Sequence, residues 1–232
     1  MIKSCWERIG EIDGLDPYRV AVGDISMLSG TTYPDPEEYA FKVDGDLAGL
    51  KKAEAALHPD TTTYAKIRGA LSRAKDNHEL DLHWVGDASE QFTDSFLVKL
   101  DQALEKLDET RNEQRAIVGK MRAGMEESHD NIVSEVESMV RQVVASYVAA
   151  VVGVGVASVA GGPAGGAAAL AAAVAGLVGL LSIHHKALKR ECAAFNKTLA
   201  DNKGGLAELV EISLPELSNK VDRSNWAMNS GD

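Results

Sequence analysis

Forty-four consecutive residues, from Gln142 to His185, contain no Asp, Glu, Lys or Arg, and this stretch constrains the fold more than any other feature. It consists of two apolar arms, 143–160 and 166–183, on either side of the sequence Gly-Gly-Pro-Ala-Gly. Each arm is about as long as a helix that crosses the hydrocarbon core of a bilayer. Because proline cannot continue a helix and glycine commonly ends one, the centre predicts a reversal. The stretch is therefore predicted to form an apolar α-hairpin.

The composition of the chain favours helices and argues against nucleic acid as a partner. Aromatic residues make up only 5% of the sequence, and much of its 45% hydrophobic share is Ala, Val and Leu, which suit helix packing better than strands. The formal net charge of -11 opposes any large phosphate-binding surface. The N-terminus carries no apolar segment of a secretory signal peptide, so export, if it occurs, is expected to use another route.

Helical periodicity predicts an all-α fold. A short helix is expected over 17–29, with Val20, Ile25 and Leu28 on its inner face, and a longer one over 36–57. A third helix follows over 60–75, with Ile67 and Leu71 on its apolar stripe. Four segments are predicted: an N-terminal helical extension (1–59), a helical hairpin (60–142), the apolar hairpin with its returning helix (143–212) and a C-terminal tail (213–232).

The strongest helical signal runs from Asp87 to Gly162 without a proline. Its apolar residues recur at spacings near 3.5, which indicates one very long helix or two nearly collinear ones. The returning arm keeps the same period as far as Leu199. If the arms turn at Pro163, residues equidistant from it face each other. The contact face at the start of the long helix is predicted to consist of Phe92, Phe96, Leu100 and Leu104.

The apolar hairpin carries small residues at four-residue intervals, and these allow two helices to approach closely. Two environments are consistent with this pattern: a tightly packed soluble hairpin, or a hairpin that enters a membrane in some functional state. Ala and Gly insert only weakly into bilayers, so neither arm scores like a leucine-rich span. The residues predicted to shape the hairpin are Gly153, Ala157, Gly161, Pro163, Gly165, Ala169 and Ala173.

A Trp-x-Gly tripeptide lies between two amphipathic helices, at Trp84-Val85-Gly86, and an acidic helix cap and Phe92 follow it. This stretch resembles the W-x-G helical-hairpin proteins exported by bacterial type VII (ESX) secretion. The resemblance covers about 60–140 and implies that Trp84 packs between the hairpin arms while Gly86 permits the tight turn. It also implies pairing with a second copy or with a small helical partner of the same family.

The chain departs from that family in its export element. The family carries a Tyr-x-x-x-Asp/Glu element on a helix after the hairpin, and none follows Tyr147. The one formal match, from Tyr33 to Glu37, precedes the hairpin and contains two prolines. We therefore expect either a partner that supplies the signal, a signal on a C-terminal extension, or a protein that is not exported.

No residue set predicts an enzyme, a cofactor or a metal site. The glycines at 153 and 155 lack the preceding strand of a dinucleotide loop, and no activated nucleophile is visible. Adjacent His184 and His185 diverge on a helix, so a helix-surface pair is favoured over metal ligands. Cys5 and Cys192 are interpreted as two unrelated thiols.

These features lead to two functional hypotheses. The first is a non-enzymatic protein associated with type VII secretion, cytoplasmic before export and then secreted or held at the cell surface, which works through helix–helix pairing. The alternative is a membrane-active or pore-forming effector whose hairpin, 143–183, leaves a soluble bundle and enters lipid. In either case the rest of the chain, a partner or lipid has to cover the apolar tip.

Overall fold

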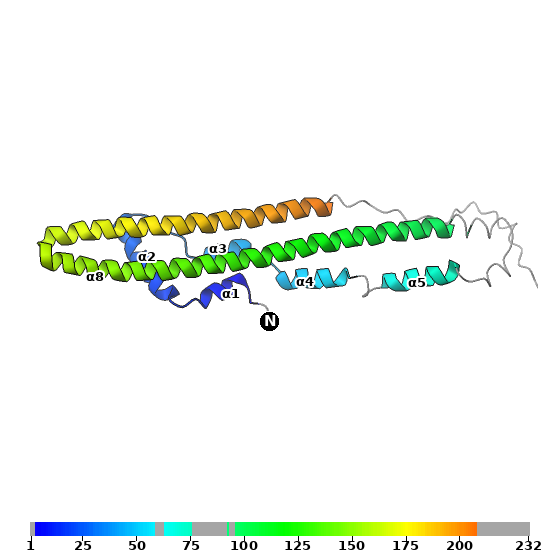
Figure 1. Cartoon of the computed structure of the whole chain (residues 1–232), viewed down its shortest axis with the longest axis horizontal. Coiled ribbons are helices and arrows are strands. Elements are labelled where there is room, and N and C mark those ends of the chain that lie inside the picture. The colour runs from blue at the N-terminus through cyan, green and yellow to red at the C-terminus, as the bar shows by residue number, and fades with distance from the viewer. Residues whose placement is uncertain (1–2, 59–62, 76–91, 93–95, 208–232) are drawn as a thin grey trace, which may run out of the picture. The chain divides into compact units, whose positions relative to one another are not determined.

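A computed structural model describes residues 3–58, 63–75, 92 and 96–207 (Figure 1). The regular elements in those ranges are helices and include no strand, so the predicted all-α class is confirmed. Two compact units arise, one from Met1–Ala48 with Met121–Asp201 and the other from Gly49–Lys120 with Asn202–Asp232, and these cut across the four predicted segments. The principal helices are α1 (Cys5–Gly10), α2 (Leu15–Ser29), α3 (Glu37–Val43), α4 (Leu47–Ala56), α5 (Thr63–Lys75) and α8 (Val98–Ala207).

Helix α8 reverses direction at Gly162, inside the stretch where the sequence predicts a turn. Gly162 has φ 66° and ψ -164°, a backbone conformation that residues with a Cβ rarely adopt. Pro163 then opens the second arm, where its missing N–H is least disruptive. Within the first unit the two arms run antiparallel (Figure 1). We name 121–161 the outgoing arm and 163–201 the returning arm.

Contacts between the arms fix which residues face each other. Asn131 donates a hydrogen bond to Glu191 at 3.3 Å. A Cβ placed on Gly124 would lie 3.0 Å from the methyl group of Thr198. Both pairs are centred on Gly161, whereas a centre at Pro163 would have placed Phe195 opposite Asn131. The predicted antiparallel pairing is therefore correct in direction and displaced by about one helical turn.

The three N-terminal helices pack on the arms and form the core of the first unit. Tyr18 of α2 is buried and its hydroxyl donates to the sulfur of Met139 at 3.5 Å. Tyr39 of α3 is buried beside Cys192, whose thiol donates to the Tyr39 carbonyl oxygen at 3.8 Å. Each large apolar side chain buried in this way contributes about 1.5–3 kcal/mol. Other fully buried members are Ile9, Ile25, Val43, Ile132, Val136, Val140, Val143, Leu181 and Leu188.

Two details of the predicted helices are wrong. Val20 and Leu28 were expected inside, but they are 62% and 57% exposed, because α2 buries the neighbouring face through Tyr18, Ala21 and Ile25. The helix expected over 36–57 is two helices, since α3 ends at Val43 and α4 begins at Leu47. The sequence Asp-Gly-Asp between them favours a break over a continuous helix.

The close approach of the arms at Gly165 yields a stability prediction. A Cβ on Gly165 would lie 2.9 Å from the backbone carbonyl oxygen of Ala157, whereas one on Gly176 would meet nothing within 4 Å. Gly165→Ala is expected to destabilise the protein by about 1–3 kcal/mol. Gly176→Ala, in the same arm, is expected to stabilise it by up to about 1 kcal/mol. Urea denaturation of both variants measures this, and equal effects of the same sign would contradict the predicted contact.

Candidate functional site

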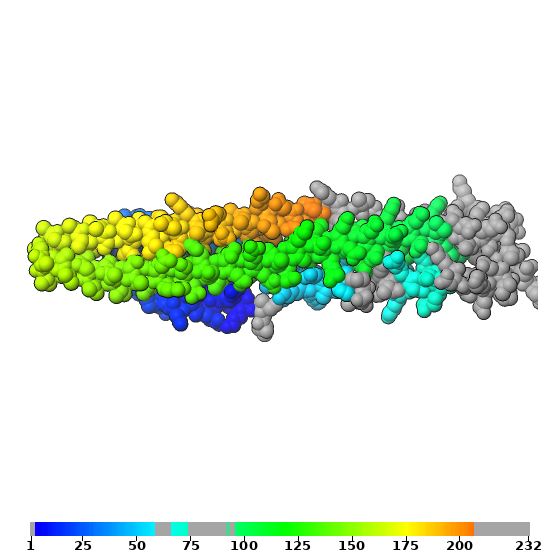
Figure 2. Space-filling view, in the orientation of Figure 1, coloured from blue at the N-terminus to red at the C-terminus, as the bar shows by residue number. Residues whose placement is uncertain are grey.

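The outer surface of the apolar hairpin is exposed. Five valines of the outgoing arm, Val148, Val151, Val152, Val156 and Val159, are 56–91% exposed. By length and composition α8 is able to cross a membrane, and only 6% of its most apolar eighteen-residue window, with mean hydropathy 2.2, is buried. A core helix of similar composition would be largely buried. In Figure 2 no atoms of other elements cover the tip of the hairpin on the face shown.

Near the turn, the half-buried residues of each arm lie at helical spacing, and a Cβ on Gly165 or Gly166 would contact Ala157 or Ser158 of the other arm. On the outgoing arm Ala150, Val154 and Ala157 are half-buried, at helical spacing. On the returning arm Gly166 and Leu177 are buried, and the predicted residues Gly165, Ala169 and Ala173 are half-buried. Predicted Gly153, Gly161 and Pro163 are exposed instead, so they do not contribute to the contact between the arms.

Helix α2 covers the base of the hairpin, but its packing is incomplete. A cavity of about 170 Å³ lies between α2 and both arms, with Ile25, Leu28, Val154, Leu170 and Leu177 in its apolar walls. The hydroxyl of Tyr147 donates a hydrogen bond to Asp24 and ties α2 to the outgoing arm. Val154 and Leu170 are the lining residues nearest the turn, so the cavity ends about eight residues short of Gly162.

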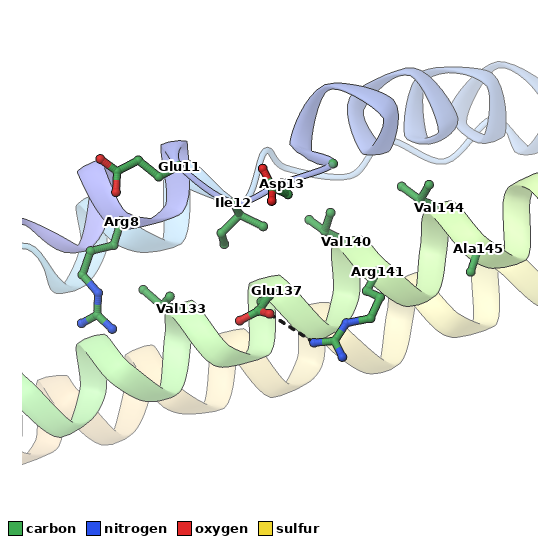
Figure 3. Close-up of a pocket in the computed structure, with 11 residues that line it drawn as sticks. Arg8, Glu11, Ile12, Asp13, Val133, Glu137, Val140, Arg141, Val144 and Ala145 are labelled. Atoms are coloured by element: carbon green, nitrogen blue, oxygen red, sulfur yellow. Dashed lines mark hydrogen bonds and ion pairs between the residues drawn. The ribbon is translucent and has the colours of Figure 1, made fainter.

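A second cavity, of about 730 Å³, opens between the α1–α2 connection and the outgoing arm (Figure 3). Its apolar floor comes from Ile12, Val133, Val140 and Val144. Its charged residues are two arginines and three acids, and both arginines are already paired: Arg8 with Asp130 at 2.7 Å and Arg141 with Glu137 at 3.3 Å. Paired cations amid excess acid do not form a phosphate site.

Three histidines of α8, His129, His184 and His185, are buried. The prediction that His184 and His185 form a pair on the helix surface is therefore wrong. His184 and His185 are 6% and 5% exposed. His129 donates from Nε2 to the carbonyl oxygen of Val43 at 3.0 Å, and His184 donates from Nδ1 to Glu135 at 2.7 Å. The Nε2 atoms of His184 and His185 are buried without a hydrogen-bond partner. No group of three metal-ligating side chains occurs in the part of the chain described here.

His185 lies at the contact between the returning arm and the chain around α3. Its Nδ1 is 3.0 Å from the hydroxyl of Tyr39, and the ring of Tyr33 stacks on its imidazole with centroids 5.3 Å apart. Burial lowers the pKa of His185 to about 4, with further lowering from Lys189 and His184. The ring is therefore neutral at physiological pH.

The two cysteines are free and buried, although they lie close enough for Cys192 to contribute to the raised pKa of Cys5. Burial raises the pKa of Cys5 to about 11, and burial also raises the pKa of Cys192. Both side chains thus remain protonated at neutral pH, and neither carries the thiolate that a nucleophile requires.

The structure describes only some of the residues on which the secretion hypothesis rests. Trp84 and Gly86 lie outside the described residues. The predicted contact face packs within the chain: Leu104 is buried with Leu71 and Leu97, and Phe92, Phe96 and Leu100 are half-buried against that cluster. Comparison with protein-family models, curated proteins and solved structures finds no match. Any functional proposal therefore rests on the exposed hairpin and the buried histidines.

The neutral state of His185 yields a pH prediction. Between the ordinary pKa of 6.5 and the lowered value of about 4, the unfolded chain binds a proton at this ring that the folded chain does not. The free energy of unfolding is therefore expected to fall as pH drops through this window, by at most about 3 kcal/mol, and the His185 contribution to level off below it. Urea denaturation at several pH values measures the slope, and His185→Gln should flatten it. An unchanged slope in that variant would contradict the assignment.

Proposed function

We propose that the protein is a non-enzymatic membrane-binding protein whose charge-free hairpin, 143–183, inserts into lipid. The observation that carries the proposal is the exposure of valine side chains around the outer surface of a segment without any charged residue. A surface this apolar is unfavourable in water, because each exposed apolar Å² contributes about 25 cal/mol when it is removed from water. Large exposed apolar patches generally mark an interaction site.

Lipid suits this surface better than a protein partner does. Between the turn and the cavity beside α2, most positions of both arms are exposed, and they include Val156 and Val159 on one and Ala167 and Ala168 on the other. A protein partner covers one face of a helix, whereas acyl chains cover every outward face. A helix also keeps its backbone hydrogen bonds internal, which is the requirement for entering hydrocarbon.

The depth of insertion follows from what already covers the arms. The cavity beside α2 ends at Val154, about eight residues or roughly 12 Å from the turn at Gly162. The hydrocarbon core of a bilayer is about 30 Å thick. With α2 in place, the free tip therefore reaches less than halfway, and the hairpin anchors in a single leaflet.

The secretion hypothesis remains a second proposal beside this one. Its motif, from Trp84 to Gly86, lies outside the described residues, and the proposal includes pairing with a second copy or with a small W-x-G partner. The two proposals are compatible, because a protein exported through a secretion system can bind a membrane afterwards. Loss of the extracellular protein when the type VII ATPase is disabled would support export, and unchanged accumulation outside the cell would contradict it.

A charge placed on the tip tests membrane insertion directly. Val156→Lys replaces a 63% exposed valine, so the fold should tolerate it. Its binding to phosphatidylcholine vesicles is expected to weaken by about tenfold to a hundredfold, because a lysine in hydrocarbon is unfavourable. Vesicle flotation measures the bound fraction.

The matched control for that experiment is Ile67→Lys. Ile67 lies on α5 and is 48% exposed, so the substitution makes a similar chemical change away from the hairpin. The control should float as the unmodified protein does. Failure of the unmodified protein to float, or equal flotation of all three proteins, would overturn the proposed function.

A further inference from the structure

The buried histidines lie where the N-terminal chain is attached to the two arms. Tyr33 and Tyr39, on either side of the start of α3, both contact the ring of His185. The hydroxyl of Tyr33 also donates to the carbonyl oxygen of Val178, at 3.5 Å, within the apolar part of the returning arm. His129 holds the end of α3 through the carbonyl of Val43. These four contacts together attach the segment 33–43 to the arms.

We propose that acidification releases α2 and α3 from the arms by protonating His185, and that the hairpin then inserts through the whole hydrocarbon core. This inference rests on the proposed membrane function and adds its regulation. The apolar part of each arm, 143–160 or 166–183, is about eighteen residues long. Once released, it extends roughly 27 Å, close to the thickness of the hydrocarbon core. In the closed state, in which α2 and α3 are attached to the arms, the free tip is less than half of that length.

The geometry around His185 explains why a proton would open this contact. A protonated imidazole carries two N–H donors. The Nδ1 donor faces the hydroxyl of Tyr39, but the buried Nε2 has no acceptor. A buried charge with an unpaired donor destabilises the closed state, whereas water satisfies both donors once the segment leaves.

The charged neighbours of His185 act in both directions. On its own helix Lys189 and His184 oppose protonation, while Glu38 of α3 favours it. On the outgoing arm Glu135 is engaged with His184. The balance among these groups sets the pH of release, so changing one of them should move that pH in a known direction.

Tyr18, Ala21 and Ile25 of α2 are buried against the arms, but the packing of its C-terminal half is incomplete. Its C-terminal half lies over the cavity of about 170 Å³ instead of a filled core. The hydrogen bond from Tyr147 to Asp24 adds one polar contact, and Asp24 is exposed. Gly30, with φ 70°, ends α2 immediately before the segment that carries Tyr33. Detachment of that segment thus removes the support at the C-terminal end of α2.

Two depth reporters separate this proposal from the proposed function. Cys5 and Cys192 are buried, so a polarity-sensitive dye can be directed to a cysteine introduced at the exposed tip (Val159→Cys) or at the exposed base (Ser146→Cys). With phosphatidylcholine vesicles, the tip dye should enter an apolar environment both at neutral pH and at about pH 5. The base dye should enter an apolar environment only at about pH 5.

Each outcome of the reporter experiment has one meaning. A tip dye that remains in water at both pH values would overturn membrane insertion itself. A base dye that behaves identically at both pH values, with the tip inserted, would overturn only the acid release.

Four variants assign the pH response to His185. His185→Gln should abolish the transition of the base dye, and His58→Gln, in the second unit, should leave it unchanged. Two further variants at exposed positions, which folding should tolerate, act on the neighbours. Lys189→Gln should raise the midpoint pH by less than about one unit, because Lys189 lies on the helix of His185 and opposes its protonation whether or not α3 is attached. Glu38→Gln should not lower it, because Glu38 stabilises the protonated ring only while α3 is attached. A lowered midpoint in Glu38→Gln, or a transition that persists in His185→Gln, would overturn the proposal.

Discussion

The burial of apolar side chains away from water stabilises this structure. Along α8 this burial is achieved over only part of the helix. At the base of the hairpin α1, α2 and α3 bury the stripe that includes Val136, Met139 and Leu188. Toward Gly162 the arms have only each other, and two helices in contact can cover only one face apiece. The same helix is thus a core element along one part of its length and an uncovered surface along another. That difference in cover, more than any reactive side chain, is the basis of the proposed membrane-binding function.

Sequence patterning predicted the features that depend on local chemistry. The charge-free stretch, the glycine and proline at its centre and the long unbroken period together indicated an antiparallel pair of helices. The break between Val43 and Leu47 was missed because Tyr39, Val43, Leu47 and Leu50 keep a helical spacing across it. Spacing records which face of a chain is apolar, but it does not record whether the backbone continues through a turn.

Burial of polar residues was the other limit of the sequence. His184 and His185 follow directly on an apolar arm and precede Lys186, a position that fits a helix surface equally well. Their burial depends on α3, which is more than a hundred residues away in the chain. The seam of Leu181, Leu188 and Cys192 did place one of the two histidines, His184 or His185, on the inner face, but it could not show that both are buried. The exposure of the hairpin's outer face likewise depends on what the other helices leave uncovered.

The single reversal at Gly162 has a topological consequence. A hairpin that enters a bilayer returns both of its ends to the side from which it came, so α1–α5 and the residues after the returning arm need not be translocated. The segment that enters carries no Asp, Glu, Lys or Arg, so its insertion moves no charged side chain through the transmembrane electric field. Insertion should therefore be equally favourable in polarised and depolarised membranes, and withdrawal should leave the ion gradients across them unchanged.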